Sequence, residues 1–219
     1  MKYRALATDY DGTLACDGRV DEPTLRALER ARARGLRLVL VTGRELTDLA
    51  NAFARLDLFD RVVAENGAVL LEPSTSTVRV LGPAPPPAFL DRLTRRHVPV
   101  FAGRCIVATF EPYHAEMLAI IRELDLPWHI ILNKEAVMAL PIGITKASGL
   151  LPALEELGVE AAHTAGIGDA ENDSALLESC GLAAAVANAL PSVKELAHVV
   201  TVAERGAGVA ELIEQLLAE

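Results

Sequence analysis

The sequence predicts an α/β fold: a three-layer, Rossmann-like core with a parallel sheet, plus a small α+β cap domain. Short apolar runs alternate with helical patterns at both ends of the chain, which is the strand–helix–strand order of parallel sheets covered by helices. Acidic clusters follow two of these runs, at positions that parallel strands would place at one sheet edge. A proline-rich segment, GPAPPPA at residues 82–88, interrupts the alternation and begins a block of different pattern.

The first part of the core is predicted from apolar runs and from helix and turn signals. An apolar run at residues 3–7 predicts a buried strand. Asp21 is the expected N-cap of a helix that has Pro23 in its first turn and that Gly35 ends. Asn66-Gly67 predicts a hairpin turn between two strands. The other elements expected here are strands at 36–41, 61–65 and 68–72 and a helix at 45–56.

The block after the prolines is predicted to be the cap. We assign residues 83–141 to it, and residues 1–82 and 142–219 to the core. The expected cap elements are helices near 89–96 and 113–124 and strands near 106–110, 128–132 and 136–140. Scattered basic side chains predict a solvated surface, of which a subset is available to select a substrate (Arg95, Arg96, His97, Arg104, His114, His129 and Lys134).

The second part of the core returns to the strand–helix alternation. We expect strands at 162–167, 182–186 and 199–202 and helices at 173–179, 192–197 and 209–217. Pro152 lies in the helix expected after Lys146, where proline removes a hydrogen bond and clashes with the preceding turn. We therefore expect that helix to start near Ser148 or to be kinked in its first turns.

The composition is that of an ordinary globular protein, with 51% hydrophobic and 23% charged residues in 219. A net charge of −9 argues against a nucleic-acid partner, because phosphate backbones attract excess Lys and Arg. No apolar run reaches the length of a membrane span or of a signal peptide. The three cysteines are expected to be buried free thiols, which indicates a cytoplasmic protein (Cys16, Cys105 and Cys180). Nothing in the sequence indicates an oligomeric state.

The first apolar run ends in Asp9-Tyr10-Asp11-Gly12-Thr13. Side chains two residues apart in an extended chain point to the same side, so Asp9 and Asp11 are expected to emerge together. Two neighbouring carboxylates repel each other unless a cation or a shared proton lies between them. The arrangement indicates a functional site, and a solvated Asp-Asp-Gly turn is the alternative.

Two further motifs offer groups that bind an anion. Thr42-Gly43-Arg44 follows the second strand, where backbone N–H groups and the Thr42 hydroxyl could hold a phosphate; an ordinary helix cap is the alternative. Lys146 lies at the expected start of a helix, where a cation opposes the helix macrodipole. That position suits a lysine that has to meet an anion.

A second acidic cluster follows the strand expected at 162–167. Its sequence, Gly168-Asp169-Ala170-Glu171-Asn172-Asp173, again places carboxylates at the carboxyl end of a parallel strand. Three or four carboxylates beside one Lys and one Thr require a hard divalent cation, and Mg²⁺ is the natural choice for oxygen ligands. The sequence therefore predicts a Mg²⁺ site that also binds a small phosphorylated metabolite.

In this order the four motifs resemble those of the haloacid dehalogenase superfamily of phosphotransferases, which carries DxDGT, a Ser or Thr, a Lys and GDxxND. The inserted block resembles the α/β cap of the Cof-like branch, which includes sugar-phosphate phosphatases and archaeal-type phosphoglycolate phosphatases. The segment AVANALPSVKELAHVVT, at residues 185–201, is similar to that branch as well. Pro152 departs from the usual uninterrupted helix, which affects the local helix geometry and leaves the role of Lys146 unchanged.

The resemblance implies a Mg²⁺-dependent phosphatase that hydrolyses a small phosphomonoester, a sugar phosphate or a phosphoglycolate-like compound, through an aspartyl-phosphate. It implies that Asp9 is the nucleophile and that Asp11 is the general acid and base. The implied metal ligands are the Asp9 side chain, the Asp11 backbone carbonyl and Asp169, with Asp173 a direct or indirect ligand. The implied phosphate-binding residues are Thr42, Gly43, Lys146 and Asn172, and Asn66 is expected near the site.

Other functions on similar scaffolds make different demands on these residues. A phosphomutase would use the same Asp9 and return the phosphoryl group to its sugar. A dehalogenase is disfavoured, because Asp11 and the metal-binding acids would have no purpose in it. A non-catalytic phosphate-binding regulatory module is disfavoured because the set of acids is complete. A receiver-type phosphoacceptor domain would be shorter and would not place its acceptor at the first strand.

Overall fold

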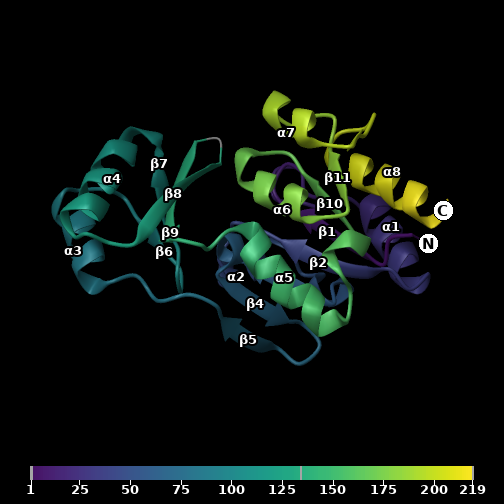
Figure 1. The fold of residues 1–219 in the computed structure, drawn as a ribbon, viewed down its shortest axis with the longest axis horizontal. Coiled ribbons are helices and arrows are strands. Elements are labelled where there is room, and N and C mark those ends of the chain that lie inside the picture. The colour runs from purple at the N-terminus through teal and green to yellow at the C-terminus, as the bar shows by residue number, and fades with distance from the viewer. Residues whose placement is uncertain (1, 134, 219) are drawn as a thin grey trace.

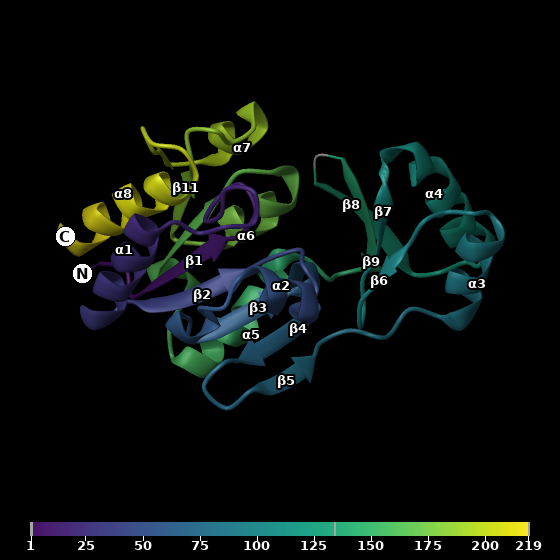
Figure 2. The same ribbon diagram turned by 180° about the vertical axis from the view of Figure 1, so that it is seen from behind.

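The computed structural model describes residues 2–133 and 135–218, so the predicted basic residue Lys134 lies outside the described residues. Figure 1 shows a larger lobe, the core, beside a smaller lobe, the cap. Two segments join them, one running from β5 to α3 and one from β9 to α5; Figure 2 shows the same two connections from behind. The fold class is the predicted one, and the cap elements lie within residues 83–141, whose boundaries stay a prediction.

An eight-stranded sheet forms the centre of the core. In spatial order its strands are β12 (Val199–Val200), β11 (Leu182–Ala185), β10 (Thr164–Gly168), β1 (Ala5–Asp9), β2 (Arg37–Val41), β3 (Arg61–Ala64), β4 (Val69–Glu72) and β5 (Thr77–Val80). The first six pair in parallel, and β4 and β5 are added by antiparallel pairing. The carboxyl ends of β10, β1 and β2 therefore lie next to one another at one edge of the sheet.

Helices cover both faces of this sheet and make the core three layers deep. Strand side chains alternate between the faces, so Leu6 points to one layer of apolar residues and Ala5 and Ala7 point to the other. The first layer contains α1 (Glu22–Ala33), α2 (Leu46–Ala52), α7 (Pro191–Leu196) and α8 (Arg205–Ala218). The opposite layer contains α5 (Lys146–Leu157), and α6 (Ser174–Ser179) contributes Leu176 to it.

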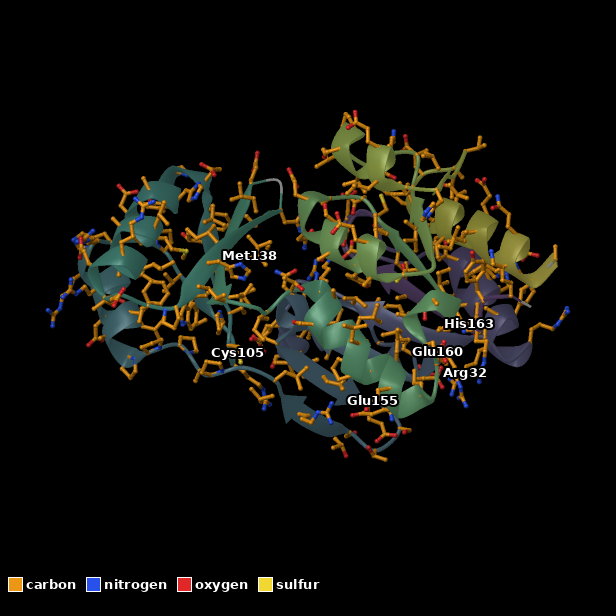
Figure 3. The ribbon with its side chains drawn as sticks, in the orientation of Figure 1. Arg32, Cys105, Met138, Glu155, Glu160 and His163 are labelled. Carbon is orange, nitrogen blue, oxygen red and sulfur yellow. The ribbon has the colours of Figure 1, made fainter. Side chains whose placement is uncertain are left out.

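The cap is a four-stranded antiparallel sheet with helices on its outer face. Its strands, in spatial order, are β6 (Phe101–Ala102), β7 (Val107–Phe110), β9 (Ala136–Pro141) and β8 (Trp128–Asn133). The helices α3 (Pro87–Arg95) and α4 (His114–Glu123) bury Phe89 and Met117 with strand residues. On its other side the cap contacts the core, where Cys105 and Met138 share an apolar cluster with Val69; Figure 3 labels both cap residues at this boundary.

Several local signals act as the sequence predicts. The side chain of Asp21 caps α1 by accepting the N–H of Thr24 at 2.9 Å, and Gly35 follows the helix with φ +88°. The strands around Asn66-Gly67 do pair antiparallel. Short 3-10 turns supplement the helices at Leu56–Leu58, Glu65–Gly67, Glu111–Tyr113, Ala161–His163 and Glu171–Asp173.

Other expectations need correction. The helix expected at 45–56 ends at Ala52, and the short strands β5 and β6 were not expected. Cys16 is exposed, so its predicted burial is wrong. The helix start expected near Ser148 is also wrong: α5 begins at Lys146 and runs through Pro152. Its start is fixed by a capping box in which the Thr145 and Ser148 side chains bond to each other's backbone N–H.

None of the helices in the described ranges is both long and apolar enough to cross a membrane.

Pro152→Ala should raise the free energy of unfolding by about 1 kcal/mol, because alanine supplies the N–H that proline lacks inside α5. Urea denaturation measures the change. Pro87→Ala is the matched control, since Pro87 occupies the first position of α3, where no helical hydrogen bond is lost. A loss of stability in Pro152→Ala would show that α5 depends on a bend at the proline.

Candidate active site

The predicted motifs meet at the edge of the sheet where β10, β1 and β2 end. Asp9 is the last residue of β1, Thr42 follows β2, and Asp169 follows β10. Lys146 enters the same place from the first turn of α5. The close approach of α5 to the turn at Glu65–Gly67 requires glycine at position 149, because a Cβ there would lie 2.5 Å from the Cα of Gly67.

A buried lysine between two carboxylates is the centre of this site. Lys146 Nζ lies 2.6 Å from Asp9 Oδ1 and 2.5 Å from Asp173 Oδ1, and the three side chains are almost fully buried. Burial by itself would lower the pKa of Lys146, but the charges of Asp173 and Asp9 and their hydrogen bonds raise it above its usual value. Lys146 is therefore a permanent cation here.

For the pKa of Asp9, burial outweighs the attraction of Lys146. Burial, followed by the nearby charges of Asp173 and Asp169, raises its pKa well above the usual value, although Lys146 acts to lower it. One lysine does not balance three buried carboxylates. A proton on Asp9 or an additional cation would relieve this excess of negative charge.

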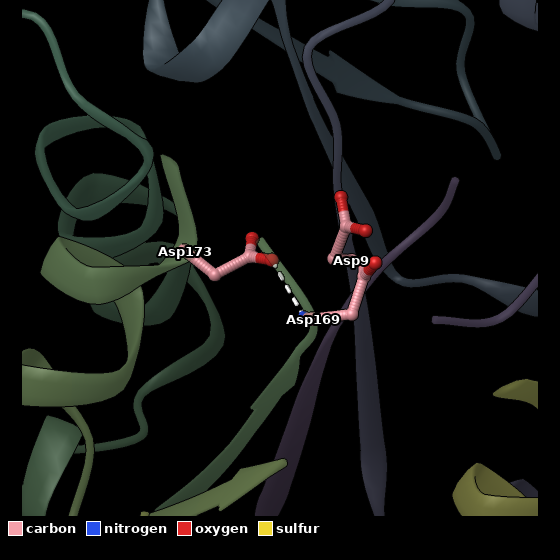
Figure 4. A group of neighbouring side chains, drawn as sticks. All are labelled: Asp9, Asp169 and Asp173. Carbon is pink, nitrogen blue, oxygen red and sulfur yellow. Dashed lines mark hydrogen bonds between the residues drawn. The ribbon is translucent and has the colours of Figure 1, made fainter. Parts of the chain in front are cut away.

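Asp173 is held by three donors. Its Oδ1 accepts from Lys146, and its Oδ2 accepts the backbone N–H of Ala170 at 3.0 Å. The same Oδ2 accepts the backbone N–H of Asp169 at 2.9 Å, which is the bond drawn in Figure 4. Thr13 Oγ1 donates to Asp169 Oδ1 at 2.9 Å, which ties the loop after β1 to the loop after β10. Gly168 leaves room for this arrangement, since a Cβ there would lie 2.5 Å from the Cβ of Asp173.

The three acids of Figure 4 fit a divalent metal ion. Asp9, Asp169 and Asp173 each offer a carboxylate oxygen, and these oxygens lie within 4.8 Å of one another. Buried carboxylate oxygens are suitable ligands for a hard cation such as Mg²⁺. Beside them, Asn172 Oδ1 is buried and has no hydrogen-bond partner within the described part of the chain.

The carboxylate of Asp11 lies outside this group of three acids. It forms a bidentate pair with Arg44, with Nε–Oδ2 at 2.6 Å and Nη2–Oδ1 at 2.8 Å. Arg44 also donates to Asp48 Oδ2 at 2.7 Å, and its hydrogen bond with Asp11 is the main reason that its pKa is raised. Arg44 belongs to the same motif as Thr42, but its pairing with Asp11 was not predicted from the sequence.

Thr42 and the two asparagines form the adjoining part of the site. Thr42 Oγ1 accepts the N–H of Arg44 at 3.1 Å, and its carbonyl accepts the N–H of Asn66 at 3.0 Å. Asn66 Oδ1 accepts from Asn172 Nδ2 at 2.9 Å. The structure therefore brings Asn66 beside Asn172, a contact that the sequence did not predict.

Two clefts lie beside the Asp11–Arg44 pair, and cap residues contribute to both. One, of about 310 Å³, lies between Gly43 and Arg44 on the core and Phe101, Gly103 and Ile106 on the cap. The other, of about 300 Å³, lies beside Asp11 and is lined by residues from both lobes (Gly12, Ala15, Asp17, Gly18, Asn133 and Arg205).

The sequence profile of the haloacid dehalogenase-like hydrolases matches residues 6–81 and 129–213. The chain belongs to this family. It is 32% identical to the phosphoglycolate phosphatase of Methanosarcina acetivorans over 99% of this chain and 97% of the relative. It is 30% identical to the phosphoglycolate phosphatase of Methanothermobacter thermautotrophicus over 98% of this chain and 99% of the relative.

A solved structure shows the same fold across nearly the whole chain. A HAD subclass IIB sugar phosphatase superposes with a TM-score of 0.80 at 21% identity, covering 97% of this chain and 98% of the other. The resemblance to the Cof-like branch and the predicted enzyme class, a hydrolase acting on phosphoric monoesters, are confirmed by the family match and these relatives.

Lys146→Met should lower the free energy of unfolding by about 3–5 kcal/mol, because it leaves buried Asp9 and Asp173 without a cation. Thermal and urea denaturation without divalent cations measure the loss. Lys194→Met is the control: Lys194 donates to the Ala187 carbonyl and forms no ion pair in the described ranges, so about 1 kcal/mol is expected. Equal losses in the two variants would contradict the central role of Lys146.

Proposed function

We propose that this hydrolase is a Mg²⁺-dependent phosphatase that cleaves a small phosphomonoester through an aspartyl-phosphate on Asp9. The observation that carries the proposal is the buried Asp9 carboxylate, which is bound to Lys146, stands beside Asp169 and lies two residues before Asp11. The site thus combines a nucleophile in Asp9, a cation in Lys146 and a further carboxyl group in Asp11 at one edge of the sheet.

In the first step an Asp9 oxygen attacks phosphorus, and the bond from phosphorus to the leaving oxygen breaks. Asp11 gives its proton to that oxygen as it leaves. In the second step Asp11 takes a proton from water, the water oxygen attacks phosphorus, and Asp9 is released with inorganic phosphate. Lys146 and the Thr42 hydroxyl stabilise the negative charge of the transferring group, and Gly43 and Asn172 complete its binding site.

Bound Mg²⁺ would neutralise charge so that an anionic carboxylate can approach an anionic phosphate. The Asp9 and Asp169 carboxylates and the Asp11 carbonyl would hold it. Asp173 already accepts from Lys146 and two backbone N–H groups, so we assign it mainly to holding Lys146 and the loop after β10. It acts on the metal indirectly.

Phosphoglycolate is the first substrate to test, because phosphoglycolate phosphatases match this chain over nearly its full length. Sugar phosphates come second, since a sugar phosphatase shares the fold at lower identity. A mutase would interconvert sugar phosphates without releasing phosphate, and a binding module would bind phosphate without turnover. One assay of free phosphate separates these functions.

Asp9→Asn should lower kcat by more than about a thousandfold while the protein stays folded, because the amide is a poor nucleophile. Phosphate release from phosphoglycolate, measured with Mg²⁺ and with EDTA, tests both the nucleophile and the metal. Asp17→Asn is the control: Asp17 lines the cleft beside Asp11 but lies outside the acidic centre. Activity near wild type in Asp9→Asn would overturn the proposal.

Arg44→Met should lower kcat for phosphoglycolate by about 10–100-fold, because Asp11 loses the bidentate partner that orients it as an acid. The first step with p-nitrophenyl phosphate, whose leaving group needs no proton, should slow by less than about threefold in a single-turnover measurement, because with this substrate Asp11 acts only in the second step. Arg55→Met, which changes an exposed arginine that pairs with Asp57, is the control. Equal losses on both substrates would exclude this role for Arg44.

A further inference from the structure

A buried carboxylate outside the acidic centre joins the cap to the core. Glu65 follows β3 and is fully buried. Its Oε1 accepts the N–H of Arg104 at 2.9 Å, and its Oε2 accepts the N–H groups of Cys105 at 2.8 Å and Ile106 at 3.0 Å. All three donors belong to the loop between β6 and β7, which we call the cap loop (residues 103–106); Figure 3 labels Cys105 at this boundary.

The cap loop is shaped around this carboxylate. A Cβ on Gly103 would lie 2.7 Å from the Glu65 carboxyl carbon and Oε1, so any side chain at position 103 would displace the carboxylate or the loop. Gly103 N–H donates to the Ile106 carbonyl at 2.9 Å, which closes the loop into a turn. Three N–H groups that converge on one carboxylate form an anion-binding concavity within the cap.

On the core side, the backbone of Glu65 is bonded to residues 42–44, which we call the phosphate-binding segment after the function proposed for it. Its N–H donates to the Arg44 carbonyl at 3.0 Å, and the next N–H, from Asn66, donates to the Thr42 carbonyl. Glu65 and Asn66 have backbone φ angles of +51° and +52°, values that residues other than glycine rarely adopt. Such backbone persists where surrounding contacts over-determine it, and it often marks a functional position.

The same cap loop forms one wall of the cleft beside the phosphate-binding segment. Gly103 and Ile106 line this cleft opposite Gly43 and Arg44. The distance between its walls therefore depends on how firmly the loop is held to Glu65. Glu65 itself does not line the cleft and is not among the acids that could hold a metal in the described ranges.

We propose that Glu65 is a positioning residue: by binding the main chain of the cap loop, it fixes the cap wall of the cleft at a set distance from the phosphate-binding segment. The leaving group of the substrate occupies the space that Glu65 defines. The kinetic part of this inference rests on the proposed phosphatase activity, whereas the binding of the cap loop does not.

The first test is Glu65→Gln. The amide keeps the size of the side chain but places an NH₂ group against backbone N–H donors, so at least one of the three hydrogen bonds is lost. Amide hydrogen exchange at residues 104–106 should accelerate by about tenfold or more, while exchange in β1 stays unchanged. This readout does not depend on turnover and remains decisive if the protein proves not to be a phosphatase.

The second readout is kinetic. For p-nitrophenyl phosphate, whose ring extends beyond the phosphate, KM should rise about tenfold in Glu65→Gln with kcat changed less than about threefold. The inhibition constant of inorganic phosphate, which needs only the core, should change less than about twofold. A merely structural loss would weaken both ligands together.

Gly103→Ala approaches the same contact from the cap side and should reproduce the KM increase, since its methyl group displaces the carboxylate. The double variant should be no worse than either single variant, because both remove one interaction. Glu123→Gln makes the same chemical change at a cap carboxylate that pairs with Arg92 and Arg96, and should have no effect on KM. Unchanged exchange in the cap loop, or equal rises in KM and in the phosphate inhibition constant, would overturn the proposal.

Discussion

The structure depends first on the contact of buried Lys146 with Asp9 and Asp173. Removing three charges from water is expensive, and only close pairing with good geometry offsets the cost. The pairing also requires a lysine at the positive end of a helix, which is unfavourable unless anions face it. The capping box of Thr145 and Ser148 fixes the start of α5, and glycine at positions 67 and 149 lets the helix approach closely. Together they place Lys146 where its attraction to Asp9 and Asp173 offsets both costs.

One turn organises the surroundings of that contact. The segment Glu65–Gly67 binds the cap loop through the Glu65 side chain and binds the carbonyls of Thr42 and Arg44 through two backbone N–H groups. It also lets α5 approach closely, because Gly67 has no side chain. Its backbone conformation is the means by which one short segment reaches three partners. The same turn of the core therefore contacts both the cap loop and the backbone of Thr42 and Arg44.

The sequence was sufficient to predict that Asp9, Asp169 and Asp173 converge, because residues that follow parallel strands share one edge of the sheet. It was also sufficient to predict most helices and strands of the core. It could not predict the partners of Arg44 and Glu65, because those depend on side-chain direction and on contacts between distant segments. The start of α5 was missed since a capping box outweighed the local penalty of Pro152. The strand β5 was missed because its alternating, mostly exposed residues carry a weak apolar signal.

The insertion of the cap between β5 and α5 also determines the order in which the protein can mature. Lys146 follows Asp9 by 137 residues, and Asp169 follows Thr13 by 156. During synthesis, β1, β2 and β3 leave the ribosome long before the partners of their acidic edge exist. Contacts between segments so far apart in sequence form slowly. The acidic edge is thus completed only after the whole cap has been made, and a shorter nascent chain carries Asp9 without the lysine that pairs with it.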